Sequence, residues 1–184
     1  MDTGQISSRY ARALLLLVDE TGGGEEVLAQ TLTLSQALSS VPQLRRVLEG
    51  RGDLPVSGKL QLFESVLGGK KLAPELRQFI TLVIRSGRVS LLRYIFSSFQ
   101  RLWYRSRKIK LCHLTVTSPS RSLEEQLEEF VRKNTGCSVQ MTTEVKPDIV
   151  GGFVFEVDDW LIDASVKTQL ETIRRGFMEM NAAH

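Results

Sequence analysis

Acidic side chains are the clearest candidates for chemistry in this sequence. Glu156, Asp158, Asp159 and Asp163 lie in one short stretch, and carboxylate oxygens of this kind are the ligands that Ca²⁺ and Mg²⁺ prefer. Apolar and polar residues alternate through the same stretch, and alternation sends neighbouring side chains of a strand to opposite faces. We therefore predict a solvated turn between two strands and no metal site.

The remaining candidates for chemistry are few. His113 lies in an apolar run and His184 is the last residue, so the two histidines form neither a catalytic triad nor a metal site with two histidine ligands. Gly58-Lys59 is similar to part of a phosphate loop, but Asp53 occupies the position of the first glycine and Leu60 that of the metal-binding Ser or Thr. We predict no catalytic, cofactor-binding or metal-binding residues and therefore no enzyme.

A basic segment, residues 101–110, interleaves arginines with Trp103 and Tyr104. Such a segment could bind the phosphates of a nucleic acid and stack on its bases. It could also be a solvated helix end whose cations oppose the negative end of the helix dipole. The segment is short and no RNA-binding module accompanies it, so we favour the helix end. A basic helical RNA-associated factor and a regulatory scaffold remain the alternative functions.

Composition indicates an ordinary globular protein. The chain has 184 residues, of which 42% are apolar and 24% charged. Cys112 and Cys137 show no metal-binding or redox spacing and are predicted to be reduced thiols in a cytoplasmic compartment. The longest apolar run, residues 13–18, is far shorter than the ~20 residues that cross a bilayer.

Helical periodicity dominates the first 108 residues. Apolar residues recur every three or four positions and predict six helices, at residues 6–18, 25–38, 42–48, 60–67, 74–84 and 90–103. Ser7 or Ser8 is expected to cap the first helix. That helix has two apolar faces, one containing Tyr10, Ala13 and Leu14, so more than one partner must cover it.

Strand periodicity appears only after residue 108. Runs at 111–117, 139–145, 153–157 and 160–162 predict strands, the last two as a tight hairpin. Ser122 and Glu125 fit a capping box for a helix that ends at Gly136. Gly151-Gly152 predicts a bulge or a close approach of two backbones. A last helix is expected to close over the hairpin with an apolar stripe made of Val166, Leu170, Ile173, Phe177 and Met180.

Charge changes sign where the periodicity changes. Residues 1–108 contain 16 Lys and Arg against 9 Asp and Glu, whereas residues 109–184 contain 8 against 12. This shift predicts a domain boundary near Arg107, Lys108 and Ile109. The expected fold class is α+β, with an N-terminal six-helix bundle (1–108) and a small C-terminal α/β domain (109–184) that contains the hairpin and the closing helix.

Three segments of the chain carry a family resemblance. The run IVGGFVFEVDDWLIDASV (149–166) closely resembles the C-terminal signature of the delta subunit of rotary (F-type) ATP synthases, the family of the oligomycin-sensitivity-conferring protein. SSRYARALL (7–15) resembles the family's first helix, and SGRV (86–89) resembles its Asn-Gly-Arg-Leu turn. Ala164 stands where family members usually have glycine.

The resemblance implies a non-catalytic stator component of the proton-translocating ATP synthase. In such a complex the helical domain would bind N-terminal segments of the alpha subunits in the catalytic head. The C-terminal domain would bind subunit b of the peripheral stalk, and the two interfaces together would resist rotor torque. The resemblance further implies no nucleic acid, only an indirect membrane association through the complex, and a place at the cytoplasmic face of the bacterial inner membrane.

Residues of two helices are predicted to contact the head. The family resemblance places the alpha-subunit segment between the helices that match the first and the fifth helix here. The core of one helix bundle can cover only one of the two apolar faces of the first helix, which leaves the other for a partner. Leu82 of the fifth helix is offset from that helix's apolar stripe. We therefore predict Tyr10, Ala13, Leu14 and Leu82 as contacts with the head, and we assign no residues to the stalk interface.

Overall fold

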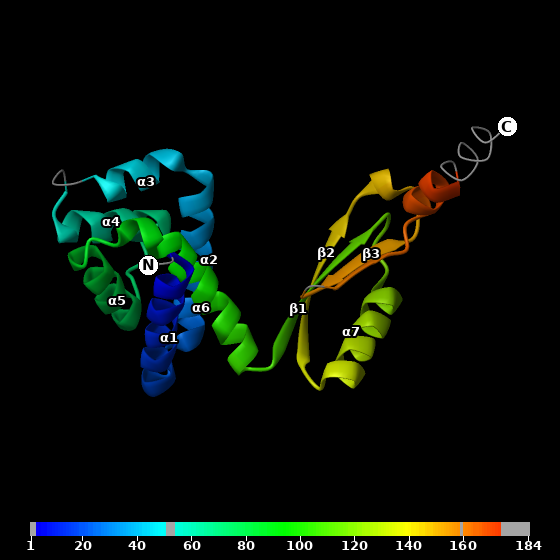
Figure 1. Cartoon of the computed structure of the whole chain (residues 1–184), viewed down its shortest axis with the longest axis horizontal. Helices are drawn as coiled ribbons and strands as arrows, with labels where there is room; N and C mark the ends of the chain where they lie inside the picture. The colour runs from blue at the N-terminus through cyan, green and yellow to red at the C-terminus, as the bar shows by residue number, and fades with distance from the viewer. Residues whose placement is uncertain (1–2, 51–53, 159, 174–184) are drawn as a thin grey trace. The chain divides into compact units, whose positions relative to one another are not determined.

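The computed structural model describes residues 3–50, 54–158 and 160–173. It divides into two compact units, Met1–Trp103 and Tyr104–His184. The first contains helices and the second a four-stranded sheet, so the α+β class is confirmed (Figure 1). The division falls inside a helix, a few residues before the boundary expected at residues 107–109.

The first unit is built from helices (Figure 1). They are α1 (Thr3–Thr21), α2 (Gly24–Ser40), α3 (Pro42–Glu49), α4 (Val56–Val66), α5 (Pro74–Arg85), the short 3-10 helix η1 (Val89–Leu91) and α6 (Leu92–Ser106), which continues past the division. Pro42 and Pro74 stand in the first turns of α3 and α5, where a missing N–H costs no hydrogen bond. The core consists of fully buried apolar side chains from all six α-helices, among them Leu14, Leu34, Leu48, Phe63, Ile80 and Phe96.

The orientation of α1 differs from the expectation. The helix begins at Thr3, so Ser7 and Ser8 lie inside it and neither caps it. Its buried side chains are those of Ser7, Ala11, Leu14 and Val18. The predicted face that contains Tyr10, Ala13 and Leu14 is therefore divided, because only Leu14 is buried. Periodicity alone could not show which side of the helix the other helices would cover.

Lys59 is a structural residue and not a phosphate ligand. Its side chain is buried, and its ammonium group donates to the carbonyl oxygens of Leu48 (2.5 Å) and Gly50 (3.2 Å). These carbonyls lie at the C-terminal end of α3, where the last groups of a helix have no partner within it. The lysine therefore ties α4 to the end of α3.

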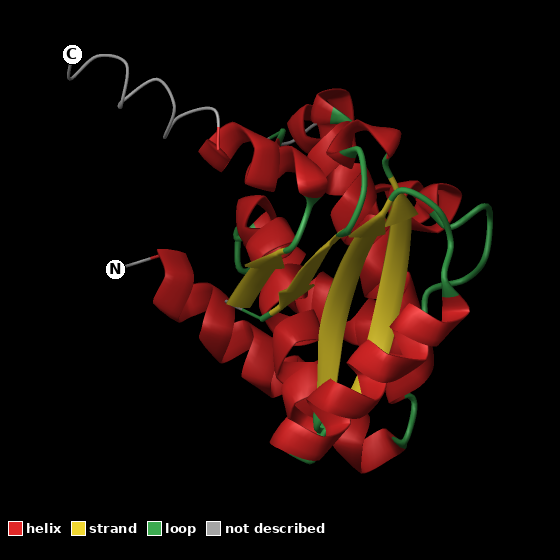
Figure 2. Ribbon diagram, turned by 90° about the vertical axis from the view of Figure 1, so that its right-hand side faces the viewer, coloured by secondary structure: helices red, strands yellow, loops and turns green. Residues whose placement is uncertain are grey.

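The second unit is a sheet with the strand order β2-β1-β3-β4. Its elements are β1 (Ile109–Val116), α7 (Arg121–Thr135), β2 (Ser138–Val145), the 3-10 helix η2 (Pro147–Ile149), β3 (Phe153–Val157) and β4 (Trp160–Asp163). β1 and β2 are parallel and joined by α7, whereas β3 is antiparallel to both β1 and β4. Figure 2 shows the four strands side by side in a twisted sheet, and the predicted hairpin is confirmed.

One face of this sheet packs against α7. Cys112, Leu114, Val116, Phe155 and Val131 form the buried core of the unit. α7 ends as predicted at Gly136, whose φ of +66° gives the left-handed cap. The predicted capping box is wrong, because α7 begins at Arg121 and Ser120 is the residue before it. Serines stand at positions 118, 120 and 122, and the local pattern could not choose among them.

The glycine pair before β3 makes a close backbone approach. Gly152 has φ +75°, and a Cβ at this position would lie 2.1 Å from the carbonyl oxygen of Ala164. Hydrogen bonds from Ala164 N to Phe153 O and from Val166 N to Gly151 O, both 2.9 Å, close the same junction. The prediction made from the two glycines is confirmed.

The last helix is described only in its first part, residues 166–173. Leu170 and Ile173 are more than half exposed, so this part does not bury the stripe that was expected to close over the hairpin. Phe177 and Met180, the other members of that stripe, lie outside the described residues. Among the described helices, none combines the length and the hydropathy that a membrane span requires.

Candidate partner-binding site

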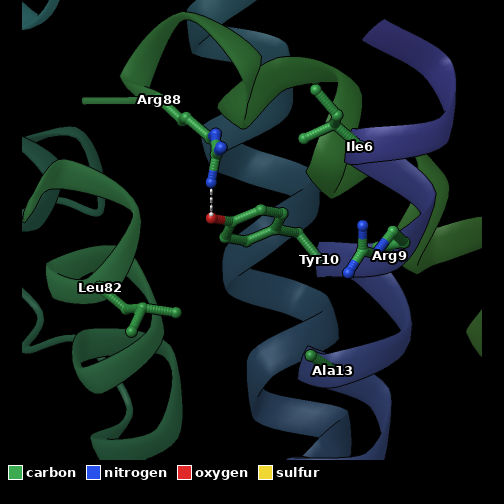
Figure 3. Close-up of a pocket in the computed structure, with 6 residues that line it drawn as sticks. All are labelled: Ile6, Arg9, Tyr10, Ala13, Leu82 and Arg88. Carbon is green, nitrogen blue, oxygen red and sulfur yellow. Dashed lines mark hydrogen bonds between the residues drawn. The ribbon is translucent and has the colours of Figure 1, made fainter. Parts of the chain in front are cut away.

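A groove lies between α1 and α5 (Figure 3). It has a volume of about 370 Å³ and is lined by Ile6, Arg9, Tyr10, Ala13, Leu82 and Arg88. Residues 6, 9, 10 and 13 share one side of α1 because a helix brings positions three and four apart onto the same side. Leu82, which is 56% exposed, faces them from α5, and Arg88 follows the end of that helix.

Tyr10 forms the middle of the groove wall. Its ring and that of Phe79 in α5 form a T-shaped pair, with 6.2 Å between centroids and an interplanar angle of 74°. Arg88 Nη1 donates to the Tyr10 hydroxyl oxygen at 2.6 Å, and the hydroxyl in turn donates to Ser86 Oγ at 3.5 Å. The guanidinium carbon of Arg88 also lies 5.6 Å from the ring centroid. Contacts with both its ring and its hydroxyl therefore hold this side chain.

Positive charge surrounds this phenol. The hydrogen bond with Ser86 is the main cause that lowers the pKa of Tyr10, and the hydrogen bond and charge of Arg88 and the charge of Arg9 act in the same direction. Stabilisation of the phenolate form is what two nearby guanidinium groups would produce. The part of the groove around Tyr10 is thus suited to negative charge.

The turn after α5 fixes the backbone of Arg88. Gly87 has φ +68°, and its N–H donates to Ile84 O at 3.0 Å, while the N–H of Arg88 donates to Val83 O at 3.1 Å. These two bonds make a Schellman motif, which satisfies the last carbonyls of the helix. These hydrogen bonds fix the backbone of Arg88, and with it the point at the rim of the groove from which its side chain extends.

The four residues predicted to contact the head do not share one surface. Tyr10, Ala13 and Leu82 line the groove, but Leu14 is fully buried in the core and cannot contact a partner. Sequence reasoning placed Leu14 beside Tyr10 because both belong to one apolar stripe, whereas the core takes the side of α1 that contains Ala11 and Leu14.

Three groove residues were missed by sequence reasoning: Ile6, Arg9 and Arg88. A signal for the two arginines was present, since Arg9 lies in the segment SSRYARALL and Arg88 in SGRV, both of which carry the family resemblance. The fold brings these two segments together across 78 positions of sequence.

Two members of the carboxylate cluster at the hairpin, Asp158 and Asp163, make structural contacts. Asp158 forms an ion pair with Lys110. Asp163 accepts hydrogen bonds from Ser165 N at 2.9 Å and from Thr168 Oγ1 at 2.7 Å, and these bonds, led by those of Ser165, lower the pKa of Asp163. The Asp163 contacts hold the start of the last helix. Asp159 lies outside the described residues, and among those described no group of three or more His, Cys, Asp or Glu side chains could hold a metal.

The aromatic residues of the basic segment are unavailable for stacking on bases. Trp103 is 5% exposed and Tyr104 8% exposed. Stacking platforms for single-stranded nucleic acids need an open ring face. Burial of both rings removes the feature that favoured the RNA-associated alternative.

A family model places the chain among known proteins. The model of the ATP synthase delta (OSCP) subunit matches residues 6–177, nearly the whole chain. The chain belongs to the ATP synthase delta (OSCP) family. Among its relatives are the proteins named ATP synthase subunit delta of Phocaeicola vulgatus, 31% identical over 98% of both chains, and of Parabacteroides distasonis, 32% identical over 97% of this chain and 99% of that one.

A solved structure supports the fold of this delta-family chain. A chain in the cryo-EM structure of the Toxoplasma gondii mitochondrial ATP synthase hexamer matches with a TM-score of 0.63, covering 94% of this chain and 97% of that one. Sequence identity is 18%, so this match speaks for the fold alone. Membership of the delta family makes the chain a structural subunit of an ATP synthase.

Proposed function

We propose that this chain is the non-catalytic stator component that links the catalytic head of a proton-translocating ATP synthase to its peripheral stalk. In this proposal Met1–Trp103 binds N-terminal segments of the alpha subunits, and Tyr104–His184 binds subunit b. The protein sits at the cytoplasmic face of the bacterial inner membrane and reaches the membrane only through the complex. Its family and the groove between α1 and α5 carry the proposal.

The groove suits an amphipathic helix from the head. Helix-in-groove recognition uses apolar anchors that recur at three- and four-residue spacing. Here Leu82 and Ile6 supply apolar contacts, and Ala13, exposed and small, lets a partner backbone approach closely. Phe79 and Arg88 already hold the Tyr10 side chain. Tyr10 therefore loses little conformational entropy when a partner binds.

The second unit has an exposed apolar edge that suits the stalk. Trp160, Leu161 and Ile162 of the edge strand β4 are 75%, 64% and 42% exposed. Trp160 and Ile162 pair with Val157 and Phe155, so they extend the sheet face that α7 covers elsewhere. Contiguous exposed apolar side chains of this kind mark interaction sites, and we assign this edge to subunit b.

Replacing Ala13 by leucine tests the head interface. We expect the A13L variant to bind a peptide of the alpha-subunit N-terminus more weakly by about 1–3 kcal/mol, because the added carbons overpack a close contact. Thermal stability should change much less, since Ala13 is exposed. Titration of the labelled peptide against the full chain measures the first quantity and circular dichroism the second.

The matched control for Ala13 is Arg12→Leu, which places the same side chain on an exposed position of α1 outside the groove lining. It should leave peptide binding unchanged. If A13L instead unfolds the protein while its folded fraction binds the peptide normally, the groove is not the docking site.

Replacing Trp160 by alanine tests the stalk interface. We expect W160A to weaken binding of the soluble part of subunit b by about 2 kcal/mol or more, because large aromatic anchors dominate interface energies. Leu111→Ala is the control, since Leu111 is also an exposed apolar residue but lies on the other face of β1. Calorimetry with the full chain compares the two variants, and equal losses would exclude the β4 edge as the binding surface.

A further inference from the structure

The groove between α1 and α5 has a charge asymmetry that the docking proposal does not explain. Its lining residues include two arginines and no aspartate or glutamate. Figure 3 shows Arg88 and Ile6 toward one end, Tyr10 and Arg9 in the middle and Ala13 toward the other end, with Leu82 facing them from α5. The groove is therefore positive around Tyr10, and apolar side chains lie one helical turn away along α1, Ile6 on one side and Ala13 on the other.

The two arginines have hydrogen-bonding capacity left for a partner. Arg88 directs one N–H to the Tyr10 hydroxyl, and a guanidinium group has five N–H donors in a fork that matches a carboxylate. Arg9 lies beside Tyr10 on α1 and is exposed. Within the described part of the chain, neither arginine forms an ion pair with a carboxylate.

We infer that the groove selects a partner helix that carries a carboxylate about one turn from its apolar anchor, and that Arg88, with Arg9 beside it, binds this carboxylate. The spacing follows from α1, where Arg9 and Ala13 are four positions, about one helical turn, apart. A segment lying along α1 would meet the apolar and the positive part of the groove one turn apart. The inference rests on the proposed docking of the alpha subunit and adds the feature that decides which segment fits.

The rigid setting of Arg88 favours this role. The Schellman turn anchors its backbone, and the Tyr10 hydroxyl holds its guanidinium. A pre-positioned guanidinium loses less conformational entropy on binding than a free surface arginine would. Arg88 thus selects a carboxylate at one position of the partner helix, whereas a free surface arginine would attract any acidic partner.

Two peptides separate charge recognition from apolar docking. One is the N-terminal segment of the alpha subunit from the same ATP synthase, and the other is the same segment with its Asp and Glu replaced by Asn and Gln. We expect the full chain to bind the acidic peptide about five- to tenfold more tightly at low salt, with most of this preference lost at about 1 M salt. Fluorescence anisotropy measures both affinities.

Arginine variants then locate the preference. Arg88→Gln should weaken the acidic peptide by about the same five- to tenfold and leave the neutral peptide unchanged. Arg88→Lys should retain part of the preference for the acidic peptide. Lysine keeps the positive charge but lacks the planar N–H donors that bind a carboxylate with two hydrogen bonds. Arg85→Gln, at an exposed position of α5 outside the groove lining, is the matched control and should change neither affinity.

The outcomes are distinguishable. If both peptides bind equally well, or if R88Q weakens both equally, the inference is overturned while the docking proposal stands. If neither peptide binds, the docking proposal fails and the inference with it. Should R88Q lower the melting temperature enough to complicate the comparison, Arg9→Gln against Arg12→Gln repeats the test without touching the Arg88–Tyr10 hydrogen bond.

Discussion

Replacing Gly152 by alanine is expected to destabilise the second unit by about 3–5 kcal/mol, because two separate costs add. The position has φ +75°, which an L-residue adopts only with strain. A Cβ there would also lie 2.1 Å from the carbonyl oxygen of Ala164, which is backbone and cannot rotate away. The junction between β3 and the last helix must therefore open.

Gly136→Ala separates the two costs. Gly136 has a similar φ of +66°, but its added Cβ would meet nothing within 4 Å. We expect that variant to lose only about 1–2 kcal/mol, the cost of the left-handed conformation. Urea unfolding followed by circular dichroism measures both losses, and equal losses for the two variants would show that the close approach to Ala164 contributes nothing.

Replacing Gly24 by alanine is expected to destabilise the first unit by about 3 kcal/mol or more, the upper part of the range for overpacking. Gly24 is the first residue of α2 and is buried. A Cβ on it would lie 1.9 Å from the Cη2 atom of Trp103, and Trp103 is itself buried and lies 6.0 Å from Phe99, centroid to centroid. Helix propensity alone would favour alanine by about 0.5–1 kcal/mol, so the steric term decides the sign.

Two comparisons test this explanation. Gly23→Ala adds the same atom one residue earlier, where the nearest neighbours are the carboxylate atoms of Glu75 at 3.1–3.2 Å, the movable end of a flexible side chain. That variant should change the melting temperature little, whereas G24A should lower it by more than about 12 °C. Adding Trp103→Phe to G24A should restore part of the loss, and a double variant less stable than the sum of the two single variants would contradict the proposed clash.

Both glycines matter for the proposed interfaces. Gly152 lies at the junction that joins β3 to the end of β4, the strand whose exposed Trp160 we assign to the stalk. Gly24 allows α2 to approach α6 closely in the unit that contains the groove. Loss of either packing contact should therefore weaken partner binding indirectly, through a smaller folded fraction, and binding assays on these variants need that correction.

The sequence alone determined those features that depend on neighbouring residues. Alternation predicted β3 and β4, Gly136 predicted the end of α7, and Gly151-Gly152 predicted the close backbone approach. The same segments carried the family resemblance that the matching family model confirms. A strand, a cap and a tight junction are fixed by local sterics and hydrogen bonding, so their signals lie within a few residues of chain.

Only the tertiary structure decided which apolar surface is buried. Packing divides one predicted apolar face of α1: Leu14 is buried together with Ala11 and Val18, whereas Tyr10 and Ala13 line the groove with Leu82 of α5. Likewise Arg9 and Arg88 meet around Tyr10 only because α1 and α5 pack side by side. Hydrophobic burial depends on area and not on direction, so a periodic pattern shows that a face can be buried, and the neighbouring elements determine which face is.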